Sequence, residues 1–432
     1  MNTDILIVGS GCSGLYCALH LPAEKKITVI AKSDLESSDS FLAQGGICVL
    51  KDESDYDAFF EDTLRAGHYE NDHESVSVMI KSSRDAIDDL VDYGVDFSRN
   101  ENGEFNYTRE GAHSSNRILF HRDITGKEIT SKLLSEAKKR NNITLIENTT
   151  LIDIIVTDGE CAGGILQMPD GSIKAVAAEY TVLATGGIGG LYRHSTNFRH
   201  LTGDAVAIAI KHGVELKNID YIQIHPTTLY SDQPTDRSFL ISESVRGEGA
   251  KLYDKNMERF VNELLPRDLL SEAIHGKMQE DGTDYVWEDL RTIPADELHE
   301  HFPNIVQHCK EKNYDVTKEC IPVVPAQHYF MGGIKVDTNS KTSMERLYAV
   351  GETACNGVHG KNRLASNSLL ESLVFAKRAA KEMAANPKTA KELPAVDLTQ
   401  YSDMDKIWKE YRESVLDMIK KSKKKSEENK NV

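Results

Sequence analysis

Glu110 is the first side chain of this sequence with a chemical role to explain, because it stands in what reads as a loop. In the stretch NYTREGAHSS (106–115), Glu110 lies between Arg109 and Gly111. A carboxylate in this setting either pairs with a nearby cation, for which Arg109 and Arg117 are available, or meets the positive charge of a ligand. The loop by itself leaves both alternatives open.

Gln223 and His225 form a second candidate, in the stretch YIQIHPTTLY (221–230). Side chains alternate along a strand, so these two should point to the same face, and Pro226 should end the hydrogen-bonded ladder. Such a pair at a strand end is placed to contact a ligand. An isolated histidine in a strand is more often a buried structural residue, and that alternative stays open.

Arg267 stands at an unfavourable place for a cation. In LPRD (265–268), Pro266 suits the first turn of a helix, which puts Arg267 at the positive end of the helix dipole. A surface salt bridge with Asp268 or Glu263 would offset this charge. The position equally suggests that Arg267 serves something outside the helix.

His328 and Arg363 lie near glycine-containing turns. His328 comes shortly before Gly332–Gly333, and Arg363 precedes a strong helix pattern in which Ser368 and Glu371 fit the S-x-x-E capping box. The N-terminus of that helix favours an anion, such as the ring of a reduced flavin. Arg363 would otherwise be an ordinary loop cation, and these scattered residues alone name no function.

The element that must position a cofactor stands at the N-terminus. TDILIVGSGCSGLYCALHL (3–21) reads as a buried strand, a glycine turn and a helix, and KKITVIAKS (25–33) reads as a second strand. The turn is a G-x-G-x-x-G fingerprint, which binds the pyrophosphate of a dinucleotide at the helix N-terminus and here consists of Gly9, Gly11 and Gly14. Lys32 stands where an acidic residue is expected, which disfavours a nicotinamide-dependent dehydrogenase.

Two distant segments should complete the same sheet. AEYTVLATGGIGGLY (178–192) and MERLYAVGETACNGVHG (344–360) each read as a strand that ends in a glycine turn. A sheet assembled from segments this far apart implies that other domains are inserted between them.

The C-terminal part predicts one amphipathic helix and a charged tail. From Met404 onward, apolar residues recur in alternating steps of four and three, up to Met418, which is the spacing of one helix face. The tail KKSKKKSEENKNV (420–432) is too polar to bury a core, so we expect it not to fold.

The composition narrows the class of protein. Its 432 residues suffice for two or three domains, and the net charge of −17 argues against nucleic acid as a partner. The seven cysteines include no C-x-x-C pair, which argues against a metal site and for reduced thiols. No apolar run reaches the length of a membrane span and no signal peptide is recognisable, so we expect a cytoplasmic protein without a membrane partner.

A series of motifs resembles the flavoproteins of the fumarate reductase and succinate dehydrogenase superfamily. These motifs cover roughly residues 1–385 and occur in the family's order: GSGCSG, SFLAQGGI, TREGAHS, ATGGIGG, TGDAVAIA, QIHPT, LPRD, AQHYFMGGI and GVHGKNRLASNSLLES. Within the superfamily, the match is with members that oxidise L-aspartate. The resemblance implies an α/β fold with a discontinuous Rossmann-like FAD-binding domain (1–208 and 321–385) and an inserted α+β capping domain (209–320). The sequence departs from the family at residues 386–432, where a shortened helical segment with a charged tail stands in place of the family's longer helical domain.

The resemblance also implies FAD as the cofactor. The residues that match the family's FAD contacts, together with the fingerprint, are Gly9, Ser10, Gly11, Cys12, Ser13, Gly14, Lys32, Ser40, Ala43, Gln44, Gly45, Gly46, Asp204, Glu352, Ser368 and Leu369. Some relatives attach FAD covalently through a histidine before the A-x-G-G turn. Asp39 stands at that position here, so we expect non-covalent FAD.

The family's substrate site is a site for a four-carbon dicarboxylate. His225, His328 and Arg363 match the residues that hold its carboxylates, with Gln223 beside them, and Arg267 matches the residue given the proton-transfer role. A guanidinium is almost never deprotonated, so a charge clamp is the alternative role for Arg267. Glu110 would face the ammonium group that distinguishes aspartate from succinate.

The expected reaction is oxidation of L-aspartate to iminoaspartate, with oxygen (giving hydrogen peroxide) or fumarate as the electron acceptor. The product would pass to quinolinate synthase and so enter NAD biosynthesis. One alternative is a fumarate reductase or succinate dehydrogenase flavoprotein subunit, which has no need of Glu110. The other is a non-catalytic FAD-binding protein.

Overall fold

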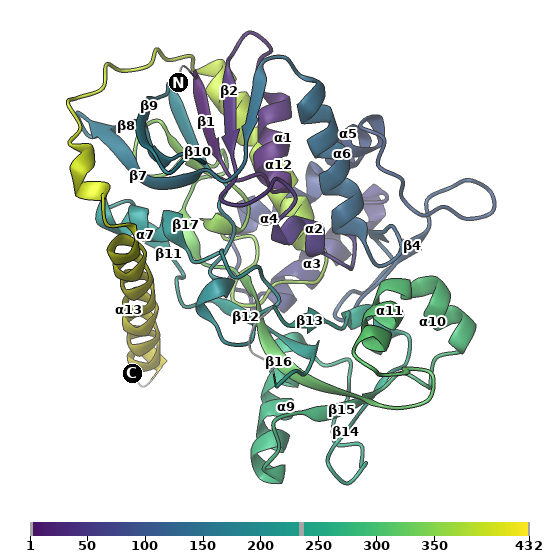
Figure 1. Cartoon of the computed structure of the whole chain (residues 1–432). Helices are drawn as coiled ribbons and strands as arrows, with labels where there is room; N and C mark the ends of the chain where they lie inside the picture. The colour runs from purple at the N-terminus through teal and green to yellow at the C-terminus, as the bar shows by residue number, and fades with distance from the viewer. Residues whose placement is uncertain (1–2, 233–236, 431–432) are drawn as a thin grey trace.

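A five-stranded parallel sheet forms the centre of the larger part of the molecule (Figure 1). The computed structural model describes residues 3–232 and 237–430. The strand order is β18-β10-β1-β2-β6, with β1 (Ile5–Val8), β2 (Ile27–Ile30), β6 (Ile143–Ile146), β10 (Tyr180–Leu183) and β18 (Leu347–Ala349). β10 and β18 are the two distant strands that the sequence predicted, and they lie on one side of β1.

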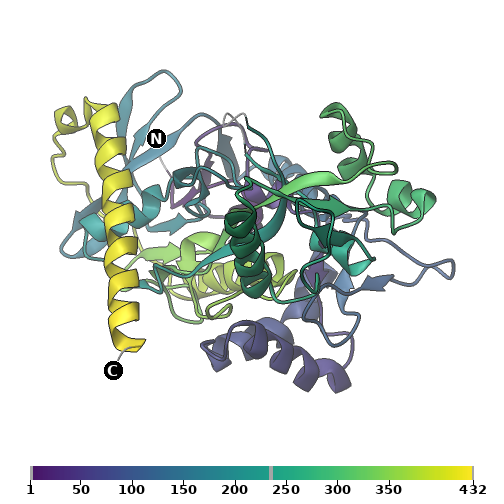
Figure 2. The same ribbon diagram turned by 90° about the horizontal axis from the view of Figure 1, so that it is seen from below.

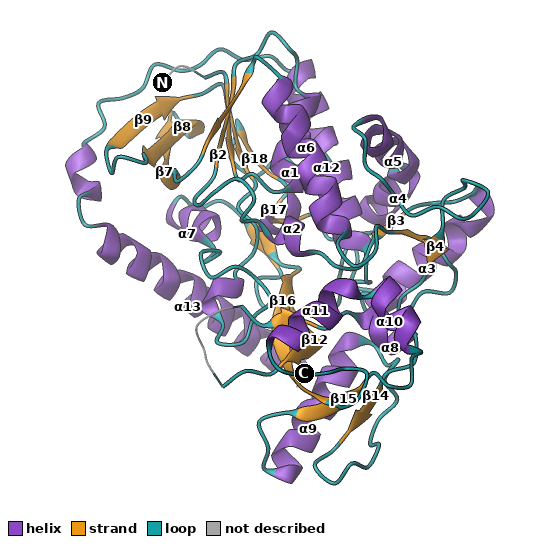
Figure 3. Ribbon diagram, turned by 45° about the vertical axis from the view of Figure 1, so that its right-hand side comes forward, coloured by secondary structure: helices purple, strands orange, loops and turns teal. Residues whose placement is uncertain are grey.

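Both faces of this sheet are covered, as its continuous apolar strands require. Three helices pack on one face, α1 (Cys12–His20), α6 (Thr125–Lys139) and α12 (Asn367–Ala385). The other face meets an antiparallel sheet and one helix (Figure 3), formed by β7 (Thr150–Thr157), β8 (Glu160–Gln167), β9 (Ile173–Ala177) and α7 (Asp204–Lys211). The layers confirm the predicted α/β dinucleotide-binding architecture.

Smaller elements surround this core. A group of helices and short strands precedes α6, namely α2 (Asp39–Leu42), β3 (Ile47–Cys48), α3 (Tyr56–Ala66), α4 (His73–Lys81), α5 (Ser83–Asp92), β4 (Tyr107–Thr108) and β5 (Ile118–Leu119). A second small sheet joins β11 (Leu216–Lys217), β17 (Gly333–Lys335) and β19 (Ala354–Cys355).

The inserted region is built on an antiparallel sheet with its own core. The strand order is β13-β12-β16-β15-β14, with β13 (Phe239–Leu240), β12 (Ile222–Leu229), β16 (Ile321–Phe330), β15 (Val286–Asp289) and β14 (Lys251–Tyr253). Its helices are α8 (Glu243–Gly247), α9 (Arg267–Asp281), α10 (Ala295–His301) and α11 (Pro303–Glu311). β16 pairs with β12 and β15 here, although its residues fall within the second FAD-domain segment expected from the sequence.

Pro226 does not end its strand, and this expectation was wrong. β12 runs from Ile222 to Leu229, and its register against β16 shifts between His225 and Thr228. A bulge of this kind accommodates a residue without a backbone N–H, so the ladder resumes beyond the proline.

The charged tail does not remain unfolded either. After a 3-10 turn (Leu398–Tyr401), α13 (Met404–Lys430) continues through the lysine-rich stretch and packs against α7 (Figure 2). Lysine and glutamate are good helix formers, and the Ser422 and Ser426 hydroxyls anchor this end by donating to Asp220, at 2.7 and 3.0 Å. The tail cannot form a hydrophobic core of its own, but it continues a helix that packs against α7 and is anchored at Asp220.

No described helix is both long and apolar enough to cross a bilayer. Within the same residues, no three His, Cys, Asp or Glu side chains gather in a way that could hold a metal ion.

Arg117 fixes the loop that carries Glu110. Its guanidinium is fully buried, with Nε 2.9 Å from Asp55 Oδ2 and Nη1 2.6 Å from Asp62 Oδ2. Arg109 is exposed. Arg117 therefore pairs with Asp55 and Asp62. Among the described residues, the ion pair between Glu110 and Arg117 that the sequence left open is not formed.

Asp62→Ala should lower the free energy of unfolding by about 3–5 kcal/mol, because it leaves the buried Arg117 charge without half of its compensation. Denaturant unfolding followed by circular dichroism would measure this change. Asp57→Ala is the matched control, at an exposed position of the same helix, and should cost less than about 1 kcal/mol. Equal, small effects of both variants would contradict the assignment.

Candidate active site

One cavity, between the parallel-sheet part and the inserted region, collects most of the residues singled out from the sequence. Every predicted cofactor residue except Gly14 lines it: Gly9, Ser10, Gly11, Cys12, Ser13, Lys32, Ser40, Ala43, Gln44, Gly45, Gly46, Asp204, Glu352, Ser368 and Leu369. The same cavity is lined by five of the predicted catalytic residues, which are Glu110, His225, Arg267, His328 and Arg363.

The glycine turn at the end of β1 has the geometry that a bound dinucleotide requires. Gly9 has φ +122°, and a Cβ built there would lie 2.0 Å from the carbonyl oxygen of Ala184. Gly14 lies behind the wall, where an added Cβ would meet the Gly9 carbonyl at 2.1 Å, so it serves close packing of helix and strand.

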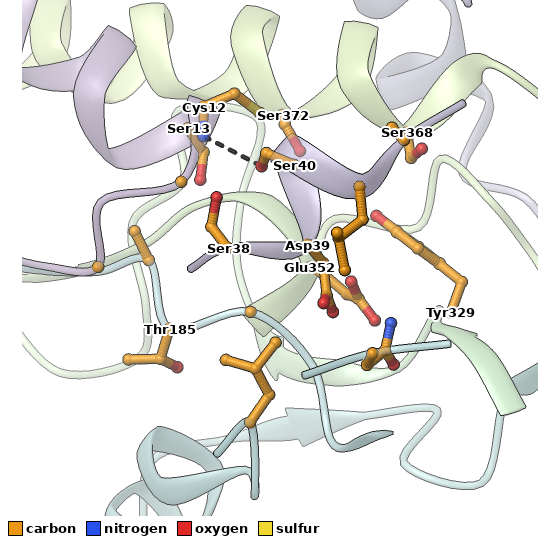
Figure 4. Close-up of a pocket in the computed structure, with 18 of the residues that line it drawn as sticks. Cys12, Ser13, Ser38, Asp39, Ser40, Thr185, Tyr329, Glu352, Ser368 and Ser372 are labelled. Carbon is orange, nitrogen blue, oxygen red and sulfur yellow. Dashed lines mark hydrogen bonds between the residues drawn. The ribbon is translucent and has the colours of Figure 1, made fainter. Parts of the chain in front are cut away.

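Helix α1 presents its N-terminus to the cavity. Its N-cap, Gly11, makes no side-chain cap hydrogen bond, and the Cys12 N–H donates to Ser40 Oγ at 3.1 Å (Figure 4). Among the described residues, buried polar atoms of the same wall also have no partner, namely Ser38 Oγ, Asp39 Oδ2, Gln44 Oε1 and Asn197 Oδ1. A helix N-terminus surrounded by such groups can bind the diphosphate and polar edges of a dinucleotide.

Lys32 is held at the end of β2 by a helix that starts on the opposite wall. Its Nζ lies 2.6 Å from Asp204 Oδ2 and donates to the His200 carbonyl oxygen at 3.0 Å. Thr202 Oγ1 donates to the other Asp204 oxygen at 2.6 Å. Asp204, from the start of α7, thus places a carboxylate beside Lys32 at the end of β2.

Two carboxyl groups lie side by side deeper in the cavity (Figure 4). Asp39 accepts from the Phe198 N–H at 3.0 Å, and Glu352 accepts from the Phe330 N–H at 2.9 Å. Burial raises the pKa of Asp39 to about 7, and burial together with Asp39 raises the pKa of Glu352 to about 8. Near neutral pH this pair therefore carries less than its full negative charge and can donate as well as accept hydrogen bonds.

His225 and His328 meet across the paired strands β12 and β16. Their ring centroids are 5.2 Å apart, and Thr196 Oγ1 lies 2.8 Å from His328 Nδ1. Burial holds the pKa of both imidazoles well below the usual range, assisted by Arg267 at His225 and by Arg363 and Arg267 at His328. They are neutral hydrogen-bonding groups in the cavity and not cations.

Arg363 points into the cavity from the loop before α12. Its guanidinium carbon stands 4.5 Å from the Tyr329 ring centroid, and Nη1 donates to Ser368 Oγ at 2.8 Å. Burial and the nearby Arg267 lower its pKa to about 10, so it remains charged at neutral pH. The capping box predicted here was wrong: α12 begins at Asn367 after Ser366, and Glu371 accepts from Asn356 inside the core.

Arg267 begins α9, as predicted, and is held by two side chains. Its Nε lies 2.6 Å from Glu243 Oε2, and its Nη1 donates to Gln223 Oε1 at 3.0 Å. Burial acts to raise the pKa of Glu243, but Arg267 and Arg246 outweigh it and keep that pKa below its ordinary value. Gln223 is buried and does not line the cavity, and it contacts the site through its hydrogen bond with Arg267.

Glu110 is buried and lies at the cavity wall. One of its oxygens accepts from Ser366 Oγ at 2.6 Å, and the other accepts from Ser244 Oγ at 3.2 Å. Burial and the adjacent Glu243 raise its pKa, although Arg267 works in the opposite direction. A ligand cation that approached this carboxylate would stabilise its ionised form.

Glu243, Ser244 and Ser366 are site residues that the sequence did not indicate. SESVRG (242–247) carries no motif, and the contact between Glu243 and Arg267 joins residues in separate elements of the inserted region. Ser366 lies within the motif GVHGKNRLASNSLLES and adopts φ +61°. The motif gave no indication of this backbone conformation.

The chain is similar to known proteins over most of its length. Residues 4–369 match the family model described as "FAD binding domain". An L-aspartate oxidase from Clostridium perfringens is 50% identical over 88% of this chain and 86% of its own length. An L-aspartate oxidase from Clostridium acetobutylicum is 49% identical over 89% of this chain and 88% of its own.

Among solved structures, a mutant FrdA chain of E. coli quinol fumarate reductase superposes with a TM-score of 0.85. It is 31% identical and is matched over 94% of this chain and 74% of that one.

Proposed function

Because the chain belongs to the family of FAD-binding domains and, within it, to the L-aspartate oxidases, we propose that it oxidises L-aspartate to iminoaspartate. It is an FAD-dependent oxidoreductase, and iminoaspartate is the first intermediate of NAD biosynthesis by way of quinolinate. Oxygen or fumarate serves as the electron acceptor. The cytoplasmic location and the direct passage of product to quinolinate synthase remain predictions from the sequence.

The observation that carries the proposal is that one cavity is lined by groups of both signs. Among its lining residues, Arg267 and Arg363 provide positive charge, the neutral His225 and His328 provide hydrogen bonds, and Glu110 provides a carboxylate beside them. L-Aspartate matches this set, since it carries two carboxylates and one ammonium group.

The residues around the glycine turn fit FAD. The uncapped N-terminus of α1 suits the diphosphate, Lys32 and Asp204 suit the adenosine side, and the Gln44 and Asp39 oxygens suit polar edges of the ring system. When bound, FAD accepts the hydrogen removed from the α-carbon of the substrate. Every other part of the reaction depends on how the side chains hold the substrate.

Arg363 and the two histidines hold the carboxylates. Arg363 Nε and His225 Nε2 are buried and have no hydrogen-bond partner among the described residues, so each has a donor or acceptor free for substrate. Because both imidazoles are neutral, they contribute hydrogen bonds without adding to the repulsion between the arginines.

Arg267 acts as a charge clamp in this proposal. Its guanidinium pairs with the Glu243 carboxylate at 2.6 Å, and a guanidinium, which is almost never deprotonated in proteins, can orient a carboxylate but not accept a proton. The proton-transfer role implied by the family resemblance remains the alternative.

Glu110 selects the amino acid. The Ser366 and Ser244 hydroxyls fix both of its oxygens, so the carboxylate is preorganised where an ammonium group would meet it. Succinate and fumarate lack that group and would leave a buried negative charge uncompensated. This feature favours aspartate oxidation over the fumarate reductase alternative.

Glu110→Gln should lower the preference for aspartate over succinate, as reductant of the bound flavin, by about tenfold or more, because a charge-assisted contact is lost. Anaerobic bleaching of the flavin absorbance by each substrate measures the ratio. Glu101→Gln, at an exposed position in the turn before β4, should leave it unchanged.

This comparison also separates the three functions. An unchanged preference in Glu110→Gln would reject the role of Glu110. Faster reduction by succinate than by aspartate in the natural sequence would favour the fumarate reductase alternative, and no reduction by either would favour a non-catalytic protein.

The KM for aspartate should rise as the pH falls through the raised pKa of Glu110, because the protonated carboxyl no longer attracts the ammonium group. The imidazoles of His225 and His328 stay neutral throughout, so no step is expected from them near their usual pKa. Steady-state kinetics across the pH range tests this. The acid limb should be absent in Glu110→Gln, and its persistence there would assign it to another group.

FAD should leave the protein on acid precipitation and remain in the supernatant, since Asp39 stands where a linking histidine would be required. The flavin absorbance of the pellet and the supernatant gives the result. A yellow pellet would show a covalent bond and would reject the expectation.

A further inference from the structure

The last helix of the chain lies against the adenosine end of the cavity. In a dinucleotide-binding fold, the end of the second strand is where the ribose next to adenine is bound, and Lys32 stands there. α13 packs along α7, whose first residue is Asp204, the ion-pair partner of Lys32 (Figure 2).

Trp408 of α13 contacts Lys32 of the Lys32–Asp204 ion pair. The Lys32 ammonium lies 5.2 Å from the centroid of the Trp408 ring, within the range of a cation–π interaction. Trp408 is half-buried and does not itself line the cavity. Any influence on a bound ligand must therefore pass through Lys32.

Neighbouring residues of α13 keep the indole in place. Tyr411 donates its hydroxyl to the Ile152 carbonyl oxygen at 2.8 Å, and its ring packs edge-on against Trp408 at 5.8 Å. One turn further, Val415 lies 3.6 Å from a Cβ built on Gly203, the residue before α7. The helix is thus fixed to the strand and the turn that form this end of the cavity.

A lysine needs such support to act as a fixed charge. Its side chain has four rotatable bonds, and holding it in one rotamer costs entropy that solvent-exposed contacts recover poorly. Asp204 and the His200 carbonyl take up one side of the ammonium, and the Trp408 ring covers another. Without the ring, water and other rotamers would compete for Lys32.

We propose that Trp408 is a positioning residue for FAD, which orders Lys32 and so links α13 to the binding of the adenosine half of the cofactor. The inference depends on FAD as the ligand and not on the substrate. A failure of aspartate to reduce the flavin would leave it intact.

Trp408→Leu keeps an apolar side chain but removes the aromatic face, and should weaken FAD binding by about three- to tenfold. Titration of the FAD-free protein, followed by flavin fluorescence, gives the dissociation constant. Trp408→Phe retains a ring and should stay within about twofold of the natural protein.

Two probes place the effect in the cavity. ADP carries only the adenosine diphosphate half and FMN only the flavin half, so Trp408→Leu should weaken ADP and leave FMN unchanged. Ile407→Ala, which loosens packing one residue away without touching Lys32, is the matched control and should change neither.

A double-mutant cycle tests the route through Lys32. Lys32→Met removes the cation, and in that background Trp408→Leu should have no further effect on FAD affinity. Additive effects would overturn the proposal, as would an equal loss of FMN and ADP binding or unchanged FAD affinity in Trp408→Leu.

If Trp408→Leu does not fold, as judged by circular dichroism, Trp408→Met takes its place in the cycle, because methionine is apolar and fills space but has no aromatic face. This variant should weaken ADP binding and leave FMN binding unchanged. An ADP affinity equal to that of Trp408→Phe would then reject the proposal.

Discussion

The buried contact between Arg267 and Glu243 is the interaction on which the site depends. Both side chains are more than nine-tenths buried, and a guanidinium in that position would cost several kcal/mol without its carboxylate. With Glu243 in place the charge is retained inside the cavity. The same charge helps to keep His225 and His328 neutral, so Arg267 and Arg363 bring positive charge to the site while the two imidazoles offer hydrogen bonds. In the proposed function, Glu110 then favours a ligand with an ammonium group.

Antiparallel pairing of β12 with β16 places these groups together. The pairing runs from Ile222 opposite Phe330 to Leu229 opposite Val323, which brings His225 near His328 although they are far apart in the chain. The shift in register after His225 lets the strand pass Pro226 and continue into the inserted sheet. A regular ladder would have kept the proline out of a central strand.

The sequence was a good guide where a local pattern has one physical cause. The apolar runs that became β1, β10 and β18, and the spacing of Gly9, Gly11 and Gly14, follow from buried parallel strands and a tight turn. The family motifs predicted Arg267, His225 and Glu110 as site residues, and all three line the cavity. The bulge at Pro226, the Glu243 partner and the full extent of α13 arise from tertiary contacts, which have no signature in the flanking residues.

Ser366 connects the part of the cavity proposed for the cofactor with the carboxylate proposed to choose the substrate. Its hydroxyl accepts from the Gly46 N–H at 3.1 Å, in the turn that lines the cofactor cavity, and donates to Glu110 at 2.6 Å. To make both bonds the residue adopts φ +61°, a conformation that costs a non-glycine residue about 1 kcal/mol or more. Gly45 leaves room for the arrangement, since a Cβ there would lie 2.8 Å from a Glu110 oxygen. Gly45, Gly46, Ser366 and Glu110 therefore form one unit, and a shift in the Gly45–Gly46 turn would move the carboxylate that we propose recognises the ammonium group.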